Sequence, residues 1–317
     1  MVNIAIAGGS GQIASEIIDV LVSKGKHEIL ILSRSIHATD PRPGVKWAQT
    51  DYTSASSLTT LFKEASIEVV LSFGAAHEDV GSVIQKTIID ACVAAGVRRF
   101  APNEWSTSKF EEIPWYAEKG TIRSYLAEIN KNATVLEYTL FQPGFISDYI
   151  APPNTSSTHI RPLEIALDLP NRRAIVLEGI DPRITLTSVK DVAEIVARAV
   201  DYEGKWPVVG GIRGQTVRTS EFIKIGEKVR GRPFPITTLQ ESDVRAGIIK
   251  SSWIPTMNVN GMKPEEIEFF SKMVLKGFLL CGLHESWMVS DEWNRLLPDH
   301  EFEGLEKFLE RTWVGRP

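Results

Sequence analysis

Two hydrophobic spacings alternate along the first third of the chain. Short continuous apolar runs predict buried strands, and apolar positions three and four residues apart predict helices. A run of the first kind predicts a strand over residues 2–7, and further strands are expected over 28–32, 45–49, 68–73 and 98–101. The second spacing predicts helices over 12–24, 54–65 and 79–95. The last helix would bury a face made of Val80, Val83, Ile84, Thr87, Ile88, Ala91, Cys92 and Ala95. This alternation predicts an α/β fold with a doubly wound parallel sheet, covered by helices on both faces.

The pattern becomes less regular after residue 104. It predicts a helix over 115–130, a strand over 135–141, a loop rich in Pro, Gly, Asn and Ser over 142–158, and helices over 189–199, 263–278 and 301–312. We therefore expect residues 1–150 to form the core domain, with 185–212 returning to it. Residues 151–317 would mainly form a smaller C-terminal lobe.

A glycine-rich stretch at residues 6–14 follows the first predicted strand and opens the first predicted helix. Glycines also mark ordinary turns, but this position is the one that a Rossmann dinucleotide loop requires. Gly8 would permit the tight turn, Gly11 would let the backbone approach a pyrophosphate, and Ala14 is small enough for the helix to pack on the sheet. The first-turn N–H groups would face the phosphates. The cofactor-binding residues expected here are Gly8, Ser10, Gly11, Gln12 and Ile13.

The residue that follows the second strand indicates which dinucleotide binds. NAD-preferring proteins usually place Asp or Glu there to hold the ribose 2′-hydroxyl, whereas this chain has Arg34 between Ser33 and Ser35. A guanidinium can pair with a 2′-phosphate and stack on adenine. The sequence therefore favours NADP(H) over NAD(H), and the alternative is that Arg34 serves only solubility.

Composition excludes several other classes of protein. The net charge is −5, from 35 basic and 40 acidic residues, and no basic run is present, so we expect no nucleic-acid partner. Two cysteines predict no disulfide framework and favour a reducing compartment. No apolar run is long enough for a membrane span, and no leader precedes the first strand, so we expect a cytoplasmic protein. The six histidines show no metal-ligand spacing, and we expect no metal site.

Tyrosine and serine motifs of familiar enzymes are also missing. None of the six tyrosines is followed by Lys four residues later, and no Gly-x-Ser-x-Gly stretch occurs. What remains is Pro102-Asn103-Glu104-Trp105, followed later by Lys119-Gly120-Thr121-Ile122-Arg123. With the glycine loop, these segments resemble the Pro-Ser-Glu-Phe-Gly and Lys-x-x-Val-Arg motifs of the isoflavone reductase-like and NmrA-like branch of the atypical short-chain dehydrogenases. The resemblance covers about the first 150 residues well and the remainder loosely.

This resemblance implies NADPH as hydride donor, a C-terminal lobe that binds substrate, and Lys119 as the catalytic lysine, which also binds the nicotinamide ribose. Without the resemblance, a lysine on a predicted helix would be interpreted as a solvated surface charge. Ligands lie at the carboxyl ends of parallel strands, so Ser72, Phe73 and Asn103 would lie beside the cofactor. Pro143 and Phe145 lie in a loop similar to the family's nicotinamide loop, although Phe145 is equally compatible with a core position.

The chain departs from the family motif next to the expected substrate pocket. Asn103 replaces the Ser of the family motif, Trp105 replaces its Phe, and Ser106 replaces the Gly that follows. The leading hypothesis is an NADPH-dependent reductase of a small aromatic or heterocyclic metabolite, with a proton from Lys119 or a water that it holds. Two alternatives stay open: a non-catalytic NADP(H)-binding redox sensor with a protein partner, and a redox-neutral condensation or cyclisation enzyme of specialised metabolism. A homodimer is compatible with each.

Overall fold

Six parallel strands form the central sheet of the computed structural model, which describes residues 1–35, 40–74, 79–257 and 263–316. The strand order is β3-β2-β1-β4-β5-β6, so the order reverses between β1 and β4. The strands are β1 (Asn3–Ala7), β2 (Glu28–Ser33), β3 (Val45–Gln49), β4 (Val69–Ser72), β5 (Arg99–Ala101) and β6 (Glu137–Tyr138). This is the doubly wound Rossmann arrangement, and it confirms the predicted fold class.

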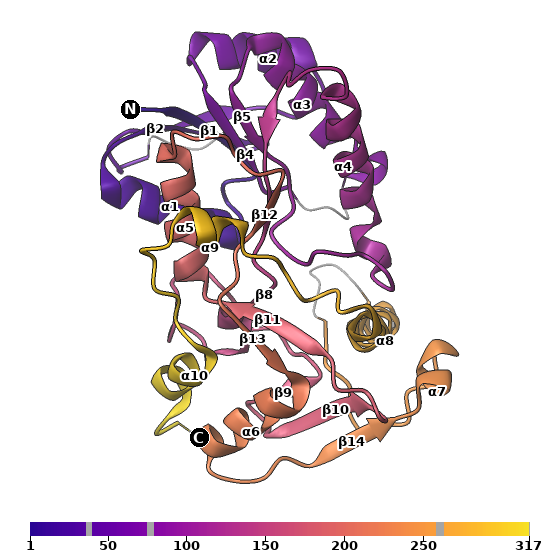
Figure 1. Cartoon of the computed structure of the whole chain (residues 1–317). Coiled ribbons are helices and arrows are strands. Elements are labelled where there is room, and N and C mark those ends of the chain that lie inside the picture. Colours follow the sequence, from indigo (N-terminus) through magenta and orange to yellow (C-terminus); the bar gives the residue numbers. More distant parts are fainter. Residues whose placement is uncertain (36–39, 75–78, 258–262, 317) are drawn as a thin grey trace.

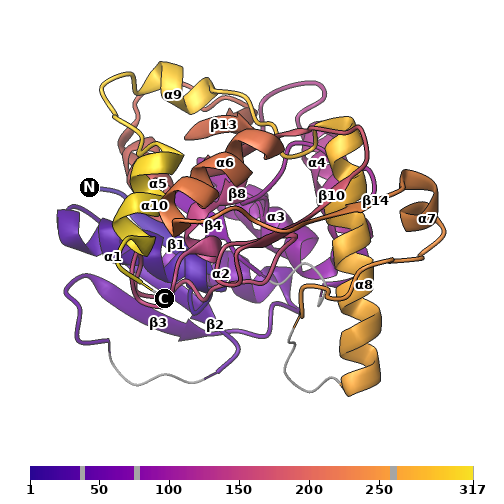
Figure 2. The same ribbon diagram turned by 90° about the horizontal axis from the view of Figure 1, so that it is seen from below.

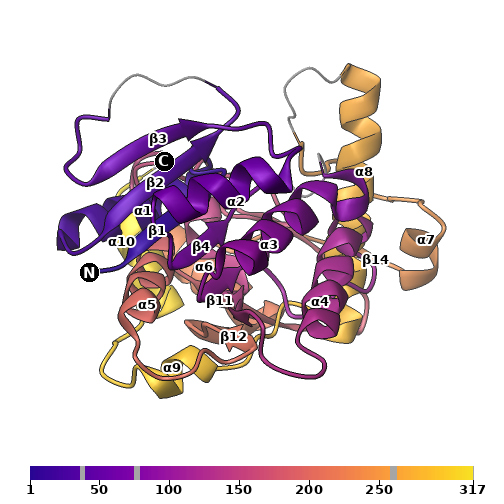
Figure 3. The ribbon, with the colours of Figure 1, turned by 90° about the horizontal axis from the view of Figure 1, so that it is seen from above.

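Helices cover both faces of this sheet (Figure 1). Alternate residues of β1 pack on each face. Ile4 and Ile6 pack in one core, together with α1 (Gln12–Lys24) and α5 (Val189–Asp201). Ala5 and Ala7 pack in the other. Figure 3 shows the helices of this second face, which are α2 (Ala55–Glu64), α3 (Val83–Ala95) and α4 (Ala117–Ile129). The Ser54 side chain caps α2 by accepting the N–H of Ser57 at 3.2 Å.

The start of α3 differs from the prediction. The carboxylate of Asp79 accepts the N–H groups of Ile84 and Gln85, so the first turn is the 3₁₀ segment η2 (Val80–Ser82) and α3 begins at Val83. Val80 and Val83 are consequently 81% and 61% exposed, while Gln85 is buried. The predicted apolar face was wrong at these two valines because capping by Asp79 sets where the helix begins.

The predicted sixth strand is divided between two sheets. β6 ends at Tyr138, and after Thr139 the chain forms β7 (Leu140–Gln142), which pairs with β12 (Val209–Gly211). The predicted loop over 142–158 was also too simple, because it contains β8 (Phe145–Ile146) and the 3₁₀ turn η4 (Ser147–Ile150). β8 forms because it pairs with β11 (Arg183–Thr187).

Two small sheets and several helices form the rest of the chain (Figure 2). One sheet holds β8, β11 and β13 (Gln215–Arg218), and the other holds β9 (Leu167–Asp168), β10 (Arg173–Leu177) and β14 (Ile236–Leu239). The remaining helical elements are η3 (Pro114–Tyr116), α6 (Thr219–Arg230), α7 (Glu241–Arg245), α8 (Pro264–Leu280), η5 (Cys281–His284), α9 (Glu292–Leu296) and α10 (Leu305–Trp313). Trp293 of α9 is fully buried in the core that includes α1 and α5, so this late segment lies against the central sheet.

Candidate cofactor and substrate site

The loop between β1 and α1 can be built only from small residues. Gly8 has φ +74°, and a Cβ there would lie 3.0 Å from the carbonyl carbon and oxygen of Phe73. A Cβ on Gly9 would lie 2.6 Å from Cγ2 of Ile31. Gly11 donates its N–H to the carbonyl oxygen of Gly8 at 3.0 Å and starts the helix. The loop therefore brings bare backbone to the amino end of α1, the arrangement that binds a pyrophosphate.

A pocket with about 1020 Å³ of empty space opens at the carboxyl ends of β1, β2, β4 and β5. Its lining includes the predicted residues Gly8, Ser10, Gly11, Arg34, Ser72, Phe73 and Asn103. Predicted residues that are not part of this lining are Gln12, Ile13, Lys119, Pro143 and Phe145. Gln12 is exposed at the start of α1, where its side chain accepts the N–H of Arg161 at 2.7 Å.

Tyr52 also lines the pocket, although no pattern in the sequence pointed to it. Its phenol donates to the carbonyl oxygen of Leu32 at 2.9 Å and accepts the N–H of Gly8 at 3.3 Å. One side chain thereby joins the end of β2 to the glycine loop. Burial raises the pKa of Tyr52, which keeps the hydroxyl neutral. Tyr52 has a positive φ of 61°, which is uncommon for a residue other than glycine and marks it as unusual, but a backbone angle is known only from a structure.

Arg34 lies just beyond the end of β2, exposed at the pocket's edge between Ser33 and Ser35. Its carbonyl oxygen accepts from the Gln49 side chain at 3.2 Å, which holds the backbone against β3. A guanidinium flanked by two hydroxyl groups suits a phosphate dianion.

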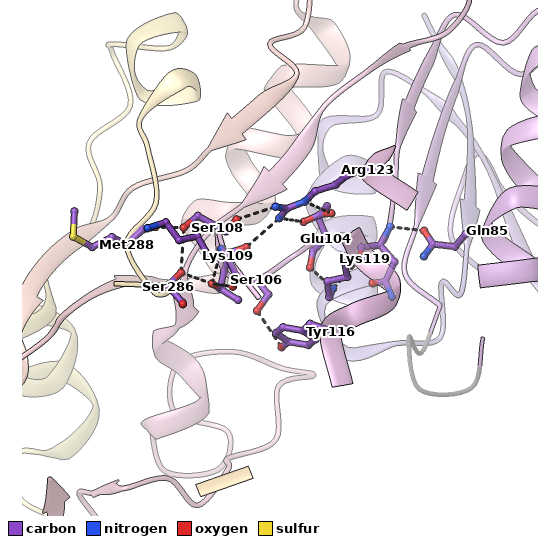
Figure 4. A network of polar contacts seen from close by, with 12 residues as sticks. Gln85, Glu104, Ser106, Ser108, Lys109, Tyr116, Lys119, Arg123, Ser286 and Met288 are labelled. Carbon is purple, nitrogen blue, oxygen red and sulfur yellow. Dashed lines mark hydrogen bonds and ion pairs between the residues drawn. The ribbon is translucent and has the colours of Figure 1, made fainter. Parts of the chain in front are cut away.

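Lys119 lies on α4 with its side chain turned inward toward the loop after β5 (Figure 4). It is 5% exposed, and its Nζ donates to the carbonyl oxygens of Asn103 at 2.8 Å and Glu104 at 2.5 Å. Burial lowers the pKa of Lys119 to about 8; Glu104 opposes this shift and Arg123 adds to it. An ammonium carries three N–H bonds, and the structure's described part supplies acceptors for two of them.

A buried ion pair fixes the loop that receives this ammonium. Glu104 is 1% exposed and accepts from Arg123 at 3.0 Å and 2.7 Å, a bidentate pair (Figure 4). Arg123 also donates to the carbonyl oxygen of Ser108 at 2.8 Å. Because Lys119 and Arg123 lie one helical turn apart, α4 binds the loop through both side chains.

Asn103 is held by partners on both neighbouring segments. Its N–H donates to the side-chain oxygen of Gln85 at 2.9 Å, and its amide donates to the carbonyl oxygen of Gly74. Its carbonyl oxygen therefore stays directed at Lys119. Gln85 was not among the predicted site residues. From the sequence it is only a polar residue that interrupts the apolar face of a helix, and its partner cannot be predicted.

Trp105 is part of the core at the edge of the site. Its ring stacks on Phe73 with centroids 4.2 Å apart and on Phe141 at 5.2 Å, and its Nε1 donates to the carbonyl oxygen of Ser72 at 2.7 Å. It is 6% exposed. Trp105, which stands where the family motif has the smaller Phe, therefore joins the loop after β5 to the end of β4.

The turn before β8 lies against the same loop. Gly144, with φ +73°, donates its N–H to the carbonyl oxygen of Ser106 at 3.1 Å. Pro143 is buried, and its carbonyl oxygen accepts from Thr187 at 2.7 Å. Phe145 is 6% exposed and packs edge-on against Tyr149, Phe278 and Trp287.

Two other features do not occur in the part of the chain that the structure describes. No three His, Cys, Asp or Glu side chains in that part of the chain are grouped to hold a metal ion. Across the same ranges, no helix is long and apolar enough to cross a membrane. Cys92 and Cys281 are both buried free thiols.

The reversed strand order, the glycine loop and the pocket at the switch point define a Rossmann-type dinucleotide-binding protein. The chain belongs to the NmrA-like family, whose model matches residues 2–309. It is 28% identical to "Oxidoreductase BOA1" of Botryotinia fuckeliana, over 74% of this chain and 78% of that protein. It is 21% identical to "Oxidoreductase swnN" of Metarhizium robertsii, over 99% and 98% of the two chains.

Solved structures share this fold. The NADPH complex of the quinone oxidoreductase QOR2 from Escherichia coli superposes with a TM-score of 0.68 at 18% identity, covering 96% of this chain and 98% of that one. The NADPH complex of leucoanthocyanidin reductase from Vitis vinifera gives 0.67 at 16% identity, covering 97% and 98%. AtPrR2 with NADP⁺ and (+)-pinoresinol gives 0.69 at 16% identity, covering 98% of each chain. At these identities the likeness establishes the fold.

Proposed function

We propose that this protein is an NADPH-dependent reductase of a small aromatic or heterocyclic molecule, with Lys119 as its proton donor. The observation that carries the proposal is the buried ammonium of Lys119, held by two carbonyl oxygens and bonded to no carboxylate among the described residues. A structural lysine at this depth would be expected to pair with a carboxylate. Here the nearby carboxylate, Glu104, is bonded by Arg123 instead.

The cofactor of this reaction is NADP(H), and the residues present fit it. A Cβ on Gly8 would meet the Phe73 backbone and a Cβ on Gly9 would meet the Ile31 side chain, so only glycine lets the loop lie this close to the sheet with its backbone bare for the pyrophosphate. Arg34 provides the positive charge that distinguishes a 2′-phosphate from a 2′-hydroxyl. The curated relatives are named oxidoreductases, and neighbours of the same fold were solved with NADPH or NADP⁺, which supports the same assignment.

Bound NADPH would supply a hydride to the substrate. The chain's own contribution is to bind, orient and protonate. Asn103 and Glu104 hold the Lys119 ammonium through their carbonyl oxygens. A pKa near 8 lets Lys119 carry a proton at neutral pH and release it readily, which general-acid catalysis requires. Phe145, Pro143 and the first turn of α1 would complete the cofactor's surroundings, as the family resemblance implies.

A substrate screen with matched lysine variants tests the proposal. Consumption of NADPH is followed by its absorbance with a panel of aromatic ketones, enones, quinones and cyclic imines. Lys119→Met should lower kcat by about 10²-fold or more, since a general acid typically contributes 10²–10⁴. Lys63→Met, on the exposed last turn of α2, is the control and should match the wild type. Full activity of Lys119→Met would refute the assigned proton donor.

A further inference from the structure

A tyrosine lies beside the buried lysine at a spacing that differs from the usual short-chain dehydrogenase motif. Tyr116 ends η3 one turn before Lys119, and the Lys119 Nζ lies 4.7 Å from the centre of the Tyr116 ring. Residues three apart on a helix share a face, so Tyr-x-x-Lys places the phenol and the ammonium on the same side of α4. A search for Tyr-x-x-x-Lys does not find this pair.

Ser106 fixes the phenol. Its hydroxyl donates to the Tyr116 oxygen at 3.0 Å (Figure 4). Its carbonyl oxygen accepts the N–H of Gly144. Ser106 is therefore bound both to α4 and to the turn before β8. Because Tyr116 accepts this bond, its own O–H is left to donate elsewhere.

The phenol stays protonated at neutral pH. Burial raises the pKa of Tyr116, and the nearby Cys281 and Glu104 add to the rise, while hydrogen bonds from Ser106 and Trp115 oppose it. Tyr116 is thus a hydrogen-bond donor rather than a base. Tyr116 in turn adds to the rise that burial causes in the pKa of Tyr149.

We propose that Tyr116 is a second catalytic residue, which donates a hydrogen bond to the substrate oxygen beside Lys119, and that Ser106 is its positioning residue. The phenol and the ammonium lie on the same side of α4, so a single acceptor atom of the substrate can receive a hydrogen bond from each of them. A carbonyl oxygen has two lone pairs and gains negative charge as a hydride adds to its carbon, so it suits both donors. A neutral imine nitrogen has one lone pair, and an iminium has none. The substrate class is therefore a ketone or enone.

This inference rests on the proposed reductase function, and a matched pair of probes separates the two. α-Tetralone is a bicyclic aromatic ketone, and dihydroisoquinoline is a cyclic imine of similar shape. The wild type should reduce α-tetralone in preference to dihydroisoquinoline. Tyr116→Phe should lower kcat/KM for α-tetralone by about 10²-fold, the typical cost of one oxyanion donor. Ser106→Ala should cost about tenfold, or 1.4 kcal/mol.

Two controls distinguish a catalytic role from a structural one. Tyr125→Phe removes a phenol of the same helix that bonds Asp90 at the surface, and it should match the wild type. Tyr116→Phe should keep the pH dependence that Lys119 sets, because only the donor to the oxygen is lost. An unchanged kcat/KM in Tyr116→Phe, or reduction of the imine alone, would overturn the proposal.

A binding measurement makes the inference independent of turnover. Calorimetry of α-tetralone with the NADP⁺-saturated protein should show binding that weakens about tenfold in Tyr116→Phe and stays unchanged in Tyr125→Phe. If the wild type binds α-tetralone in this way but consumes no NADPH, the reductase proposal fails and the Tyr116 contact stands. If α-tetralone does not bind the wild type, the Tyr116 inference is overturned.

Discussion

The ammonium nitrogen of Lys119 lies 2.8 Å from the backbone carbonyl oxygen of Asn103, the residue that also lines the pocket at the carboxyl end of the sheet. Helix α4 and the loop after β5 meet at this bond. It places a titrating group where hydride chemistry is proposed. The electrostatics of this contact lead to the first two predictions.

Lys119 should make stability rise with pH in a defined window. Its pKa falls from 10.5 to about 8 on folding, because burial disfavours the charged form. Between these values the unfolded chain binds more protons, so the free energy of unfolding should rise with pH by about 3 kcal/mol. Urea unfolding of the wild type and Lys119→Met at several pH values gives this difference. A difference between the two proteins that stays constant from pH 7.5 to about 10.5 would contradict the buried, titrating lysine.

Substitutions at the neighbouring ion pair should move the Lys119 titration in opposite directions. Glu104 raises the pKa of Lys119 and Arg123 lowers it. Glu104→Gln should therefore shift the alkaline limb of the kcat profile to lower pH, and Arg123→Met should shift it to higher pH. The profiles are recorded below the unfolding temperature of each variant, since losing a buried partner costs about 3–5 kcal/mol. Shifts of the same sign in both variants would show that Lys119 does not set the limb.

Two glycines with the same backbone angle should differ sharply in function. Gly8 and Gly96 both have φ +74°, but a Cβ would meet the Phe73 carbonyl at 3.0 Å in the first and nothing within 4 Å in the second. Gly96→Ala should cost roughly 1–2 kcal/mol of stability, the price of left-handed backbone, and leave NADPH binding unchanged. Gly8→Ala should cost more and abolish binding. Calorimetry and thermal unfolding measure both quantities, and normal NADPH affinity in Gly8→Ala would contradict the loop assignment.

Arg34 should discriminate between the two dinucleotides. Arg34→Gln should weaken NADPH binding by about tenfold or more, at least 1.4 kcal/mol, and leave NADH binding unchanged. Arg98→Gln is the control, because Arg98 is exposed just before β5 at the opposite end of the sheet. Titrations at equal salt are needed since the contact is electrostatic. Equal losses for NADPH and NADH would assign Arg34 a role other than reading the 2′-phosphate.

Local patterns predicted the fold well where burial alone determines structure. The helix over 12–24 has the predicted bounds, because a helical apolar stripe is decided within the segment. The strand over 45–49 also has the predicted bounds, although only Val45 of it is buried. The prediction failed where a side chain or a distant strand decides. Asp79 sets the start of α3, and β8 forms only because β11 lies beside it.

The candidate site shows the same division. The glycine loop and Arg34 could be predicted because their spacing from the first two strands is fixed along the chain. Lys119 came from the family resemblance, since no sequence pattern reveals that a helix buries an ammonium against two carbonyl oxygens. Tyr52 and Ser106 were missed as site residues because their contacts, with Gly8 and Tyr116, depend on how loops fold over the sheet.

The stoichiometry of NADPH consumption tests the central claim most directly. Product formation and NADPH oxidation are followed in the same reaction, with the wild type and with Lys119→Met, on the substrate that the screen identifies. A reductase that uses Lys119 as proton donor should oxidise one NADPH for each product molecule, and Lys119→Met should lose both signals together. Product formation without NADPH oxidation would instead assign the protein a redox-neutral reaction, and undiminished turnover by Lys119→Met would remove the lysine from the chemistry.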